Sequence, residues 1–178
     1  LKKGKGAAFL YQGYWEDIGT ISSYYEANLS LTTNDLGLDL YNEILPIYAH
    51  NHYLPGARLK SSQLKDSIIC DGAIVEGKEV THSIVGVRSV VKKGTVIKDS
   101  ILLGNKTYTD VNDATVEYSI GENCYIQKAI IDLDVQIGNH VHLSNKKNLE
   151  SFDGDGIYIR DGIIIVTSGT VLPDGFIL

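Results

Sequence analysis

Residues 69–102 read ICDGAIVEGKEVTHSIVGVRSVVKKGTVIKDSIL, and a short repeat runs through them. An aliphatic residue returns at every fifth or sixth position, at Ile69, Val75, Val80, Val85, Val91, Ile97 and Leu102. An amphipathic helix repeats every 3.6 residues or so, and hairpins place polar turns about eight to twelve residues apart. A spacing near six fits neither pattern, and it favours a solenoid built from short stacked strands.

The same spacing continues toward the C-terminus. It is found at Ile120, Ile126, Ile131, Ile137 and Leu143, and again at Ile159, Ile165, Val171 and Ile177, which are separated by six each time. The stretch 105–115 is polar and lacks the repeat, so we expect it to form a loop extruded between two parts of the stack.

Turn-prone residues flank the aliphatic positions, for example Asp71-Gly72, Gly94 and Gly138-Asn139. A parallel β-helix needs such residues, because its corners require positive φ, which Gly, Asn and Asp adopt at the least steric cost. The sequence therefore predicts an all-β fold, a hexapeptide-repeat parallel β-helix over residues 61–178. A β-sandwich with coincidental spacing is the alternative.

The first 60 residues have a different pattern. Residues 1–35 hold an aromatic, strand-like stretch from Phe9 to Trp15, a turn at 17–20 and a helix that Thr20 or Ser22 caps. The apolar positions Ile21, Tyr24, Tyr25 and Leu29 have helical spacing, and Asn34 closes the segment. Residues 36–60 carry two of the three prolines and are expected to be a linker.

Composition narrows the class of protein. The 178 residues carry a net charge of −6 with scattered Lys and Arg, which argues against a nucleic-acid partner. Two distant cysteines, Cys70 and Cys124, are too few for a disulfide framework, and no apolar run is long enough for a membrane span, so we expect a cytoplasmic protein. The lack of methionine indicates a piece of a longer chain.

Several motifs resemble one enzyme family. YWEDIGT at 14–20 and YEANL at 25–29 are similar to the end of the catalytic domain of sugar-nucleotide pyrophosphorylases. PIY at 46–48, HSIVGVRS at 82–89, IGEN at 120–123, AIID at 129–132 and YIRDGI at 158–163 narrow the resemblance to ADP-glucose pyrophosphorylase. The resemblance implies a left-handed β-helix for 61–178, a catalytic-domain remnant for 1–35, and a homotetramer.

The resemblance also implies an activity for the full-length parent. Such an enzyme joins glucose 1-phosphate to the adenylyl group of ATP and releases pyrophosphate, in glycogen or starch synthesis. Asp17 matches the family's Mg²⁺ ligand, although a turn or helix-capping role is the alternative reading of that residue. The Gly-rich phosphate loop and a second carboxylate motif do not occur in these residues, so the fragment alone is predicted to be inactive.

This chain differs from the family at two positions of the regulatory site. Phosphorylated effectors bind there between the two domains, and two β-helix positions are usually Lys or Arg; here they are Leu133 and Ser168, beside a retained Asp132. We expect a weak or different response to such effectors. Arg160, Lys128, Lys146 and Lys147 are candidates to replace the missing cations.

Two other classes of function stay open. A hexapeptide-repeat acyltransferase would use His82 as a general base, whereas the family resemblance favours a packing and hydrogen-bonding role for it. A non-catalytic regulatory subunit is the second alternative. The pairs His50/His52 and His140/His142 permit metal binding, but neither comes with a further ligand at convincing spacing.

Overall fold

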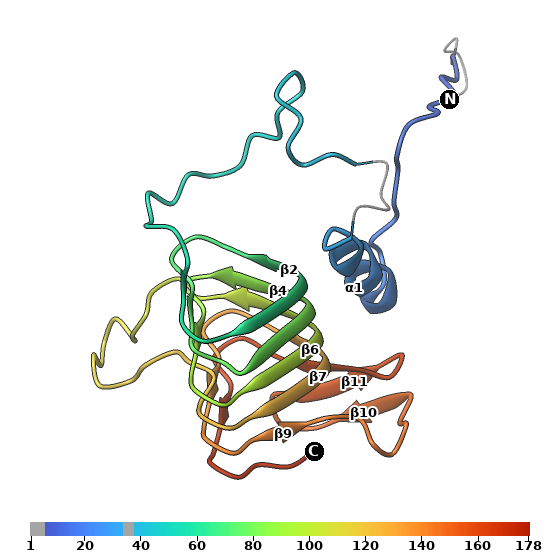
Figure 1. Cartoon of the computed structure of the whole chain (residues 1–178). Coiled ribbons are helices and arrows are strands. Elements are labelled where there is room, and N and C mark those ends of the chain that lie inside the picture. Colours follow the sequence, from blue (N-terminus) through green and yellow to red (C-terminus); the bar gives the residue numbers. More distant parts are fainter. Residues whose placement is uncertain (1–5, 34–37) are drawn as a thin grey trace.

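The computed structural model of the chain describes residues 6–33 and 38–178. Its coils stack along one axis, and one helix lies beside the stack (Figure 1). The elements are α1 (Ile21–Ser30), β1 (Arg58–Leu59), β2 (Gln63–Ile69), β3 (Ile74–Val75), β4 (Glu79–Val87), β5 (Val90–Val91), β6 (Val96–Gly104), β7 (Tyr125–Ile131), β8 (Gln136–Ile137), β9 (His142–Leu143), β10 (Ser151–Asp153), β11 (Ile157–Arg160), β12 (Ile163–Val166) and β13 (Val171–Leu172). Within the described ranges, no helix combines the length and hydropathy that a membrane span needs.

The strands pair in parallel from coil to coil, as the six-residue spacing predicts. Val80 of β4 lies opposite Ile97 of β6, which lies opposite Ile126 of β7, which lies opposite Leu143 of β9. All four side chains are completely buried. Burying one such side chain contributes roughly 1.5–3 kcal/mol, so this inward ladder is the main source of stability. The predicted parallel β-helix is confirmed, and a β-sandwich is excluded.

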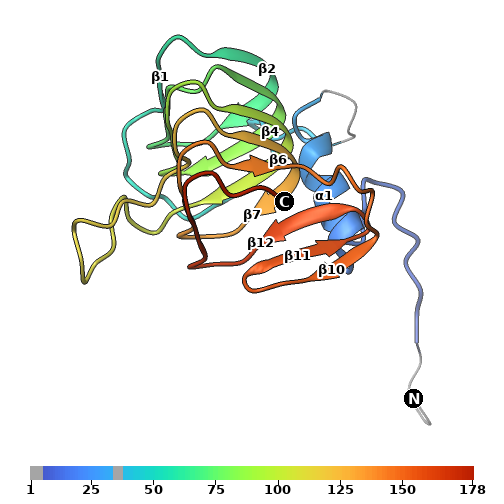
Figure 2. The same cartoon turned by 90° about the horizontal axis from the view of Figure 1, so that it is seen from below.

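Three of the four predicted inward positions of the last stretch, Ile165, Val171 and Ile177, are wrong by one residue, whereas Ile159 is buried as predicted. Val171 and Ile177 are 63% and 72% exposed, whereas Leu172 is 4% exposed and lies opposite Ile137. Upstream of them, β11 and β12 form an antiparallel hairpin with β10, beside the coils and on the same side as α1 (Figure 2). This insertion resets the phase of the repeat, so the inward ladder continues at Val166, opposite Ile131.

One corner of the coil is built from ionisable residues rather than from glycine. The long strands β2, β4, β6 and β7 each bend at a residue with positive φ, which is Asp66, His82, Asp99 and Lys128 in turn. These residues stack in register between the paired positions on either side. Asp was expected at corners, but His and Lys at φ 44° and 53° were not.

A serine follows three of these corner residues, Asp66, His82 and Asp99. Its hydroxyl binds backbone groups that lose their strand partners at the bend. Ser83 is fully buried, and its hydroxyl donates to the carbonyl of Thr81 and accepts the N–H of Ser100 on the next coil. In the same way, the hydroxyl of Ser100 donates to the carbonyl of Lys98 and accepts the N–H of Ala129. Each hydroxyl therefore satisfies one donor and one acceptor that the bend would leave buried and unpaired.

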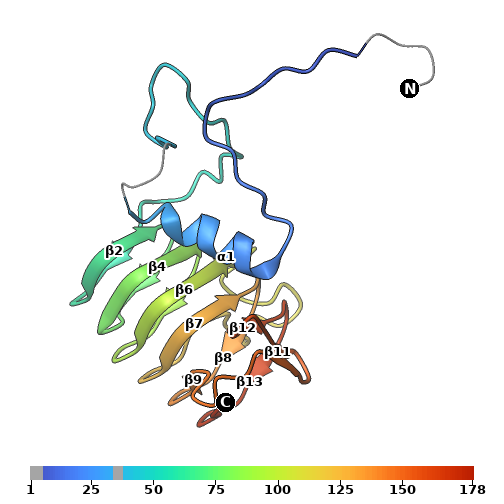
Figure 3. The same cartoon turned by 90° about the vertical axis from the view of Figure 1, so that its right-hand side faces the viewer.

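The helix α1 packs across the outer surface of β4, β6 and β7 (Figure 3). Its buried residues Tyr25 and Leu29 lie in one apolar cluster with Ile101, Ile130 and Ile163. Thr20 is the N-cap, and its side chain and that of Ser23 form a reciprocal capping box, which confirms one of the two caps predicted. The predicted end at Asn34 lies outside the described residues, and α1 itself ends at Ser30.

Alkaline pH is expected to loosen α1 through Tyr25. Its hydroxyl donates to the carbonyl of Asp99, and burial, with the charge of Asp99, raises the pKa of Tyr25 well above its usual range. The unfolded state therefore loses the tyrosine proton at lower pH than the folded state, so stability falls as pH rises through about 10. We expect Tyr25→Phe to flatten the stability-against-pH curve above pH 10, measured by urea unfolding. An unchanged curve in the variant would show that Tyr25 does not anchor the helix.

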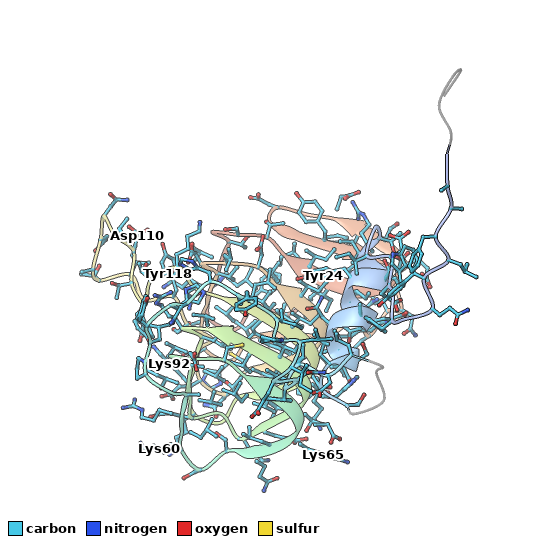
Figure 4. The ribbon with its side chains drawn as sticks, turned by 90° about the horizontal axis from the view of Figure 1, so that it is seen from above. Tyr24, Lys60, Lys65, Lys92, Asp110 and Tyr118 are labelled. Atoms are coloured by element: carbon cyan, nitrogen blue, oxygen red, sulfur yellow. The ribbon has the colours of Figure 1, made fainter. Side chains whose placement is uncertain are left out.

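The predicted N-terminal strand does not form. Residues 9–15 are neither helix nor strand, and Phe9 and Trp15 are 89% and 73% exposed. A strand needs a hydrogen-bonded partner, and within residues 6–33 and 38–178 none pairs with this stretch. By contrast, the loop predicted around 105–115 is confirmed, and it projects from the stack with Asp110 in it and Tyr118 just after it (Figure 4). The first parallel pair, at Arg58–Leu59, begins just before the expected boundary at 61.

Candidate functional site

The structure brings together three of the four residues expected to bind an effector. Asp132 follows β7 directly, and Ser168 follows β12, which pairs with β7. One carboxylate oxygen of Asp132 accepts the backbone N–H of Leu133 at 2.7 Å, and the other accepts that of Ser168 at 3.2 Å. A carboxylate between two backbone donors from different coils thus holds this site together.

The charge at this site is negative. Burial, together with the negative charge of Asp132, raises the pKa of Tyr24 on α1, so the carboxylate lies close enough to the helix to affect it. No salt bridge among the described residues involves Asp132. The two backbone donors that could hold a phosphate are already used by the carboxylate, and the side chains of Leu133 and Ser168 carry no charge.

Arg160 is engaged elsewhere. Its guanidinium donates to the backbone carbonyls of Phe152 and Ile159, pairs with Asp153, and lies over the ring of Tyr158. All of these partners belong to β10 and β11. Arg160 therefore braces the hairpin. The structure does not place it with Asp132, Leu133 and Ser168, which we call the Asp132 group.

Asp17 lies in an exposed turn. Its carboxylate accepts the backbone N–H of Gly19 at 3.0 Å, just before the helix cap. In the part of the chain that the structure describes, no three His, Cys, Asp or Glu residues come close enough to hold a metal ion. A single carboxylate does not make a Mg²⁺ site, since this ion needs several oxygen ligands. The described residues would supply at most one ligand of such a site.

A groove of about 600 Å³ lies on the other side of α1. Tyr25 and Leu29 of the helix line one wall, and the corner residues His82, Asp99 and Lys128 line another. The loop 144–150 and the turn at 161–162 complete the groove, although Lys147 does not line it. Asp132, Leu133 and Ser168 do not line this groove.

The polar side chains of the groove are partly fixed by one another. The imidazole Nδ1 of His82 lies 2.8 Å from a carboxylate oxygen of Asp99, which confirms a hydrogen-bonding role for this histidine. The rings of Tyr125 and His142 are stacked with centroids 4.9 Å apart, and Nε2 of His142 lies 2.8 Å from the hydroxyl of Ser144. Burial, with the charge of Lys146, lowers the pKa of His142.

The sequence reading missed the groove but not all of its parts. Lys128 and Lys146 were candidates from their charge alone, and the structure places both in the groove. His82 and Asp99 are 17 residues apart, which is one coil here, so the coil length would have predicted their contact. The paired histidines His50 and His52 contact each other edge to face, outside the groove.

A comparison with known protein families gives one match. The family model for the GLGC left-handed parallel β-helix domain matches residues 52–177, which is more than half of the chain. The match supports the left-handed sense expected for the coils, and it begins a few residues before β1.

Proposed function

The chain belongs to the family of GLGC left-handed parallel β-helix domains, the C-terminal domain of ADP-glucose pyrophosphorylases, and on this premise we propose that it assembles and regulates a glucose-1-phosphate adenylyltransferase. The parent enzyme would convert ATP and glucose 1-phosphate to ADP-glucose and pyrophosphate. A homotetramer is the assembly that we propose for it.

The observation that carries this proposal is the packing of α1. The helix bears the YEANL motif that resembles the end of the catalytic domain, and its Tyr25 and Leu29 are buried against outward isoleucines of the β-helix. Close-packed contacts of this kind have low compressibility and transmit strain. A change at the β-helix surface would therefore reach the catalytic domain through this helix.

The catalytic role of this chain is limited to Asp17. In the parent enzyme its carboxylate would hold Mg²⁺ together with ligands from outside these residues, and the ion would neutralise charge on the phosphate oxygens. The chain's own contribution is the turn that presents the carboxylate, with one oxygen bound to the N–H of Gly19. The chain alone is expected to be inactive.

The regulatory part of the proposal rests on Asp132, Leu133 and Ser168. With neither side chain cationic and with both backbone donors bound to Asp132, this site lacks the charge to hold a phosphate. Charge-assisted contacts to phosphate contribute roughly 1.5–3 kcal/mol each, so losing two lowers the affinity for an effector by a factor on the order of 10².

The test follows pyrophosphate release by the full-length parent with and without fructose 1,6-bisphosphate and 3-phosphoglycerate. We expect little activation, and we expect Leu133→Lys with Ser168→Lys to lower the activator concentration needed by a factor of about 10–100. Val111→Lys, at an 80% exposed position in the projecting loop, is the matched control and should change nothing. The chain alone serves as the blank.

Strong activation of the unmodified parent would contradict the regulatory part and leave the family assignment standing. Absence of any ADP-glucose synthesis would instead favour the second candidate, a non-catalytic subunit of a mixed tetramer. The Asp132 group favours that reading as well, since it lacks both cations of the regulatory site.

A further inference from the structure

A small cavity lies among the inward side chains, where the projecting loop leaves the stack. Leu102, Ile120 and Ile131 of the core line it, and so do Asn105 and Ser119, which flank that loop. Of the residues that line the cavity, all except Asp132 are buried. Its volume is about 20 Å³, which is enough for a bound water, whereas a metabolite needs a pocket of roughly 300 Å³ or more.

Ser89 lines this cavity with a polar atom that no protein group satisfies. The residue is 4% exposed, and its hydroxyl has no hydrogen-bond partner among residues 6–33 and 38–178. No other buried side-chain nitrogen or oxygen in those ranges lacks a partner. The buried hydroxyls of Ser83 and Ser100, by contrast, each donate one hydrogen bond and accept another. Because an unpaired buried hydroxyl is costly, the cavity favours a ligand that can form hydrogen bonds.

Asn105 and Ser119 add further polar groups. The amide nitrogen of Asn105 donates to the carbonyl of Arg88 at 3.0 Å and to that of Tyr118 at 3.2 Å, which uses both of its hydrogens. The side-chain oxygen of Asn105 remains an acceptor. Ser119 is 7% exposed and contributes a second hydroxyl. The cavity therefore has three residues with polar side chains that could bind one small molecule, apart from the carboxylate of Asp132.

We propose that this cavity holds a structural water, which binds the hydroxyl of Ser89 and the polar groups of Asn105 and Ser119. A buried water makes about three hydrogen bonds, and it can both donate and accept. This water would join the coil to the two ends of the projecting loop, beside the Asp132 group. The inference goes beyond the proposed function, because it requires only the folded chain.

A crystal structure of the chain, at a resolution that shows ordered waters, tests the proposal directly. We expect a density peak in the cavity at about 2.5–3.0 Å from Oγ of Ser89. A cavity without density, or a Ser89 hydroxyl that donates to a protein carbonyl, would overturn the proposal. Neither result depends on whether the parent enzyme makes ADP-glucose.

Urea unfolding of Ser89→Ala gives a second test, in which the sign of the change decides. If water satisfies the hydroxyl, its removal loses hydrogen bonds, and we expect the urea midpoint to fall by about 0.3–1 M. If the hydroxyl is unpaired, alanine removes an unfavourable group and the midpoint rises. Ser151→Ala, at an exposed position of β10, is the matched control and should leave the midpoint unchanged. A midpoint that rises or stays constant in Ser89→Ala contradicts the bound water.

Discussion

Leu172→Ala is expected to lower the free energy of unfolding by about 2–5 kcal/mol, whereas Val171→Ala should change it by less than about 0.5 kcal/mol. Leu172 is 4% exposed and lies opposite Ile137 in the inward ladder, so its truncation leaves a cavity. Val171 is 63% exposed, and truncating it removes little buried surface. The measurement is urea unfolding of the two variants beside the unmodified chain.

The two substitutions are adjacent and chemically similar, so they test the phase of the repeat rather than the general tolerance of the segment. A large loss with Val171→Ala and a small one with Leu172→Ala would mean that the regular spacing from Ile159 to Ile177 marks the inward row. The register would then be shifted by one residue, which turns every side chain to the opposite face.

The phase could not be read from this part of the sequence, for a physical reason. Ile165-Val166, Val171-Leu172 and Ile177-Leu178 are apolar at both positions, so either phase gives a regular six-residue row. The earlier coils hold similar pairs, such as Ile74-Val75 and Val90-Val91, but no hairpin interrupts the repeat there, and the predicted positions Val75 and Val91 are confirmed. A pair of apolar residues predicts a strand, but it does not predict which face of the strand is buried.

The expected effector residues came from motifs, and the coil geometry explains why three of them meet. Pairing of β7 with β12 sets Ile131 opposite Val166, so the residues that follow, Asp132 and Ser168, lie close together. Arg160 was a candidate to replace a missing cation, but it lies in a hairpin that the repeat does not predict. The groove was missed because α1, a loop and a turn enclose it together with the corner residues, and no periodicity relates these three segments to the coils.

Removing the corner serines is expected to have an effect of similar size. Ser83→Ala combined with Ser100→Ala should lower the free energy of unfolding by about 2–5 kcal/mol, since each buried unpaired donor costs about 1–3 kcal/mol. The hydroxyl of Ser83 accepts the N–H of Ser100 at 3.1 Å, and that of Ser100 accepts the N–H of Ala129 at 3.2 Å. Both N–H groups lose their acceptor in the double variant, and the carbonyls of Thr81 and Lys98 lose their donors.

Ser67→Ala is the graded control for this prediction. Ser67 occupies the same corner on the first coil, where it is only partly buried, and it accepts the N–H of Ser83 at 3.3 Å. Water can replace its hydroxyl there, so the loss should stay below about 1 kcal/mol in urea unfolding. Equal losses from Ser67→Ala and from the double variant would show that side-chain volume, rather than paired backbone groups, sets the stability of the corner. The bends at His82 and Asp99 would then need another source of compensation, because they break the ladder beside the fully buried residues Ser83 and Ser100.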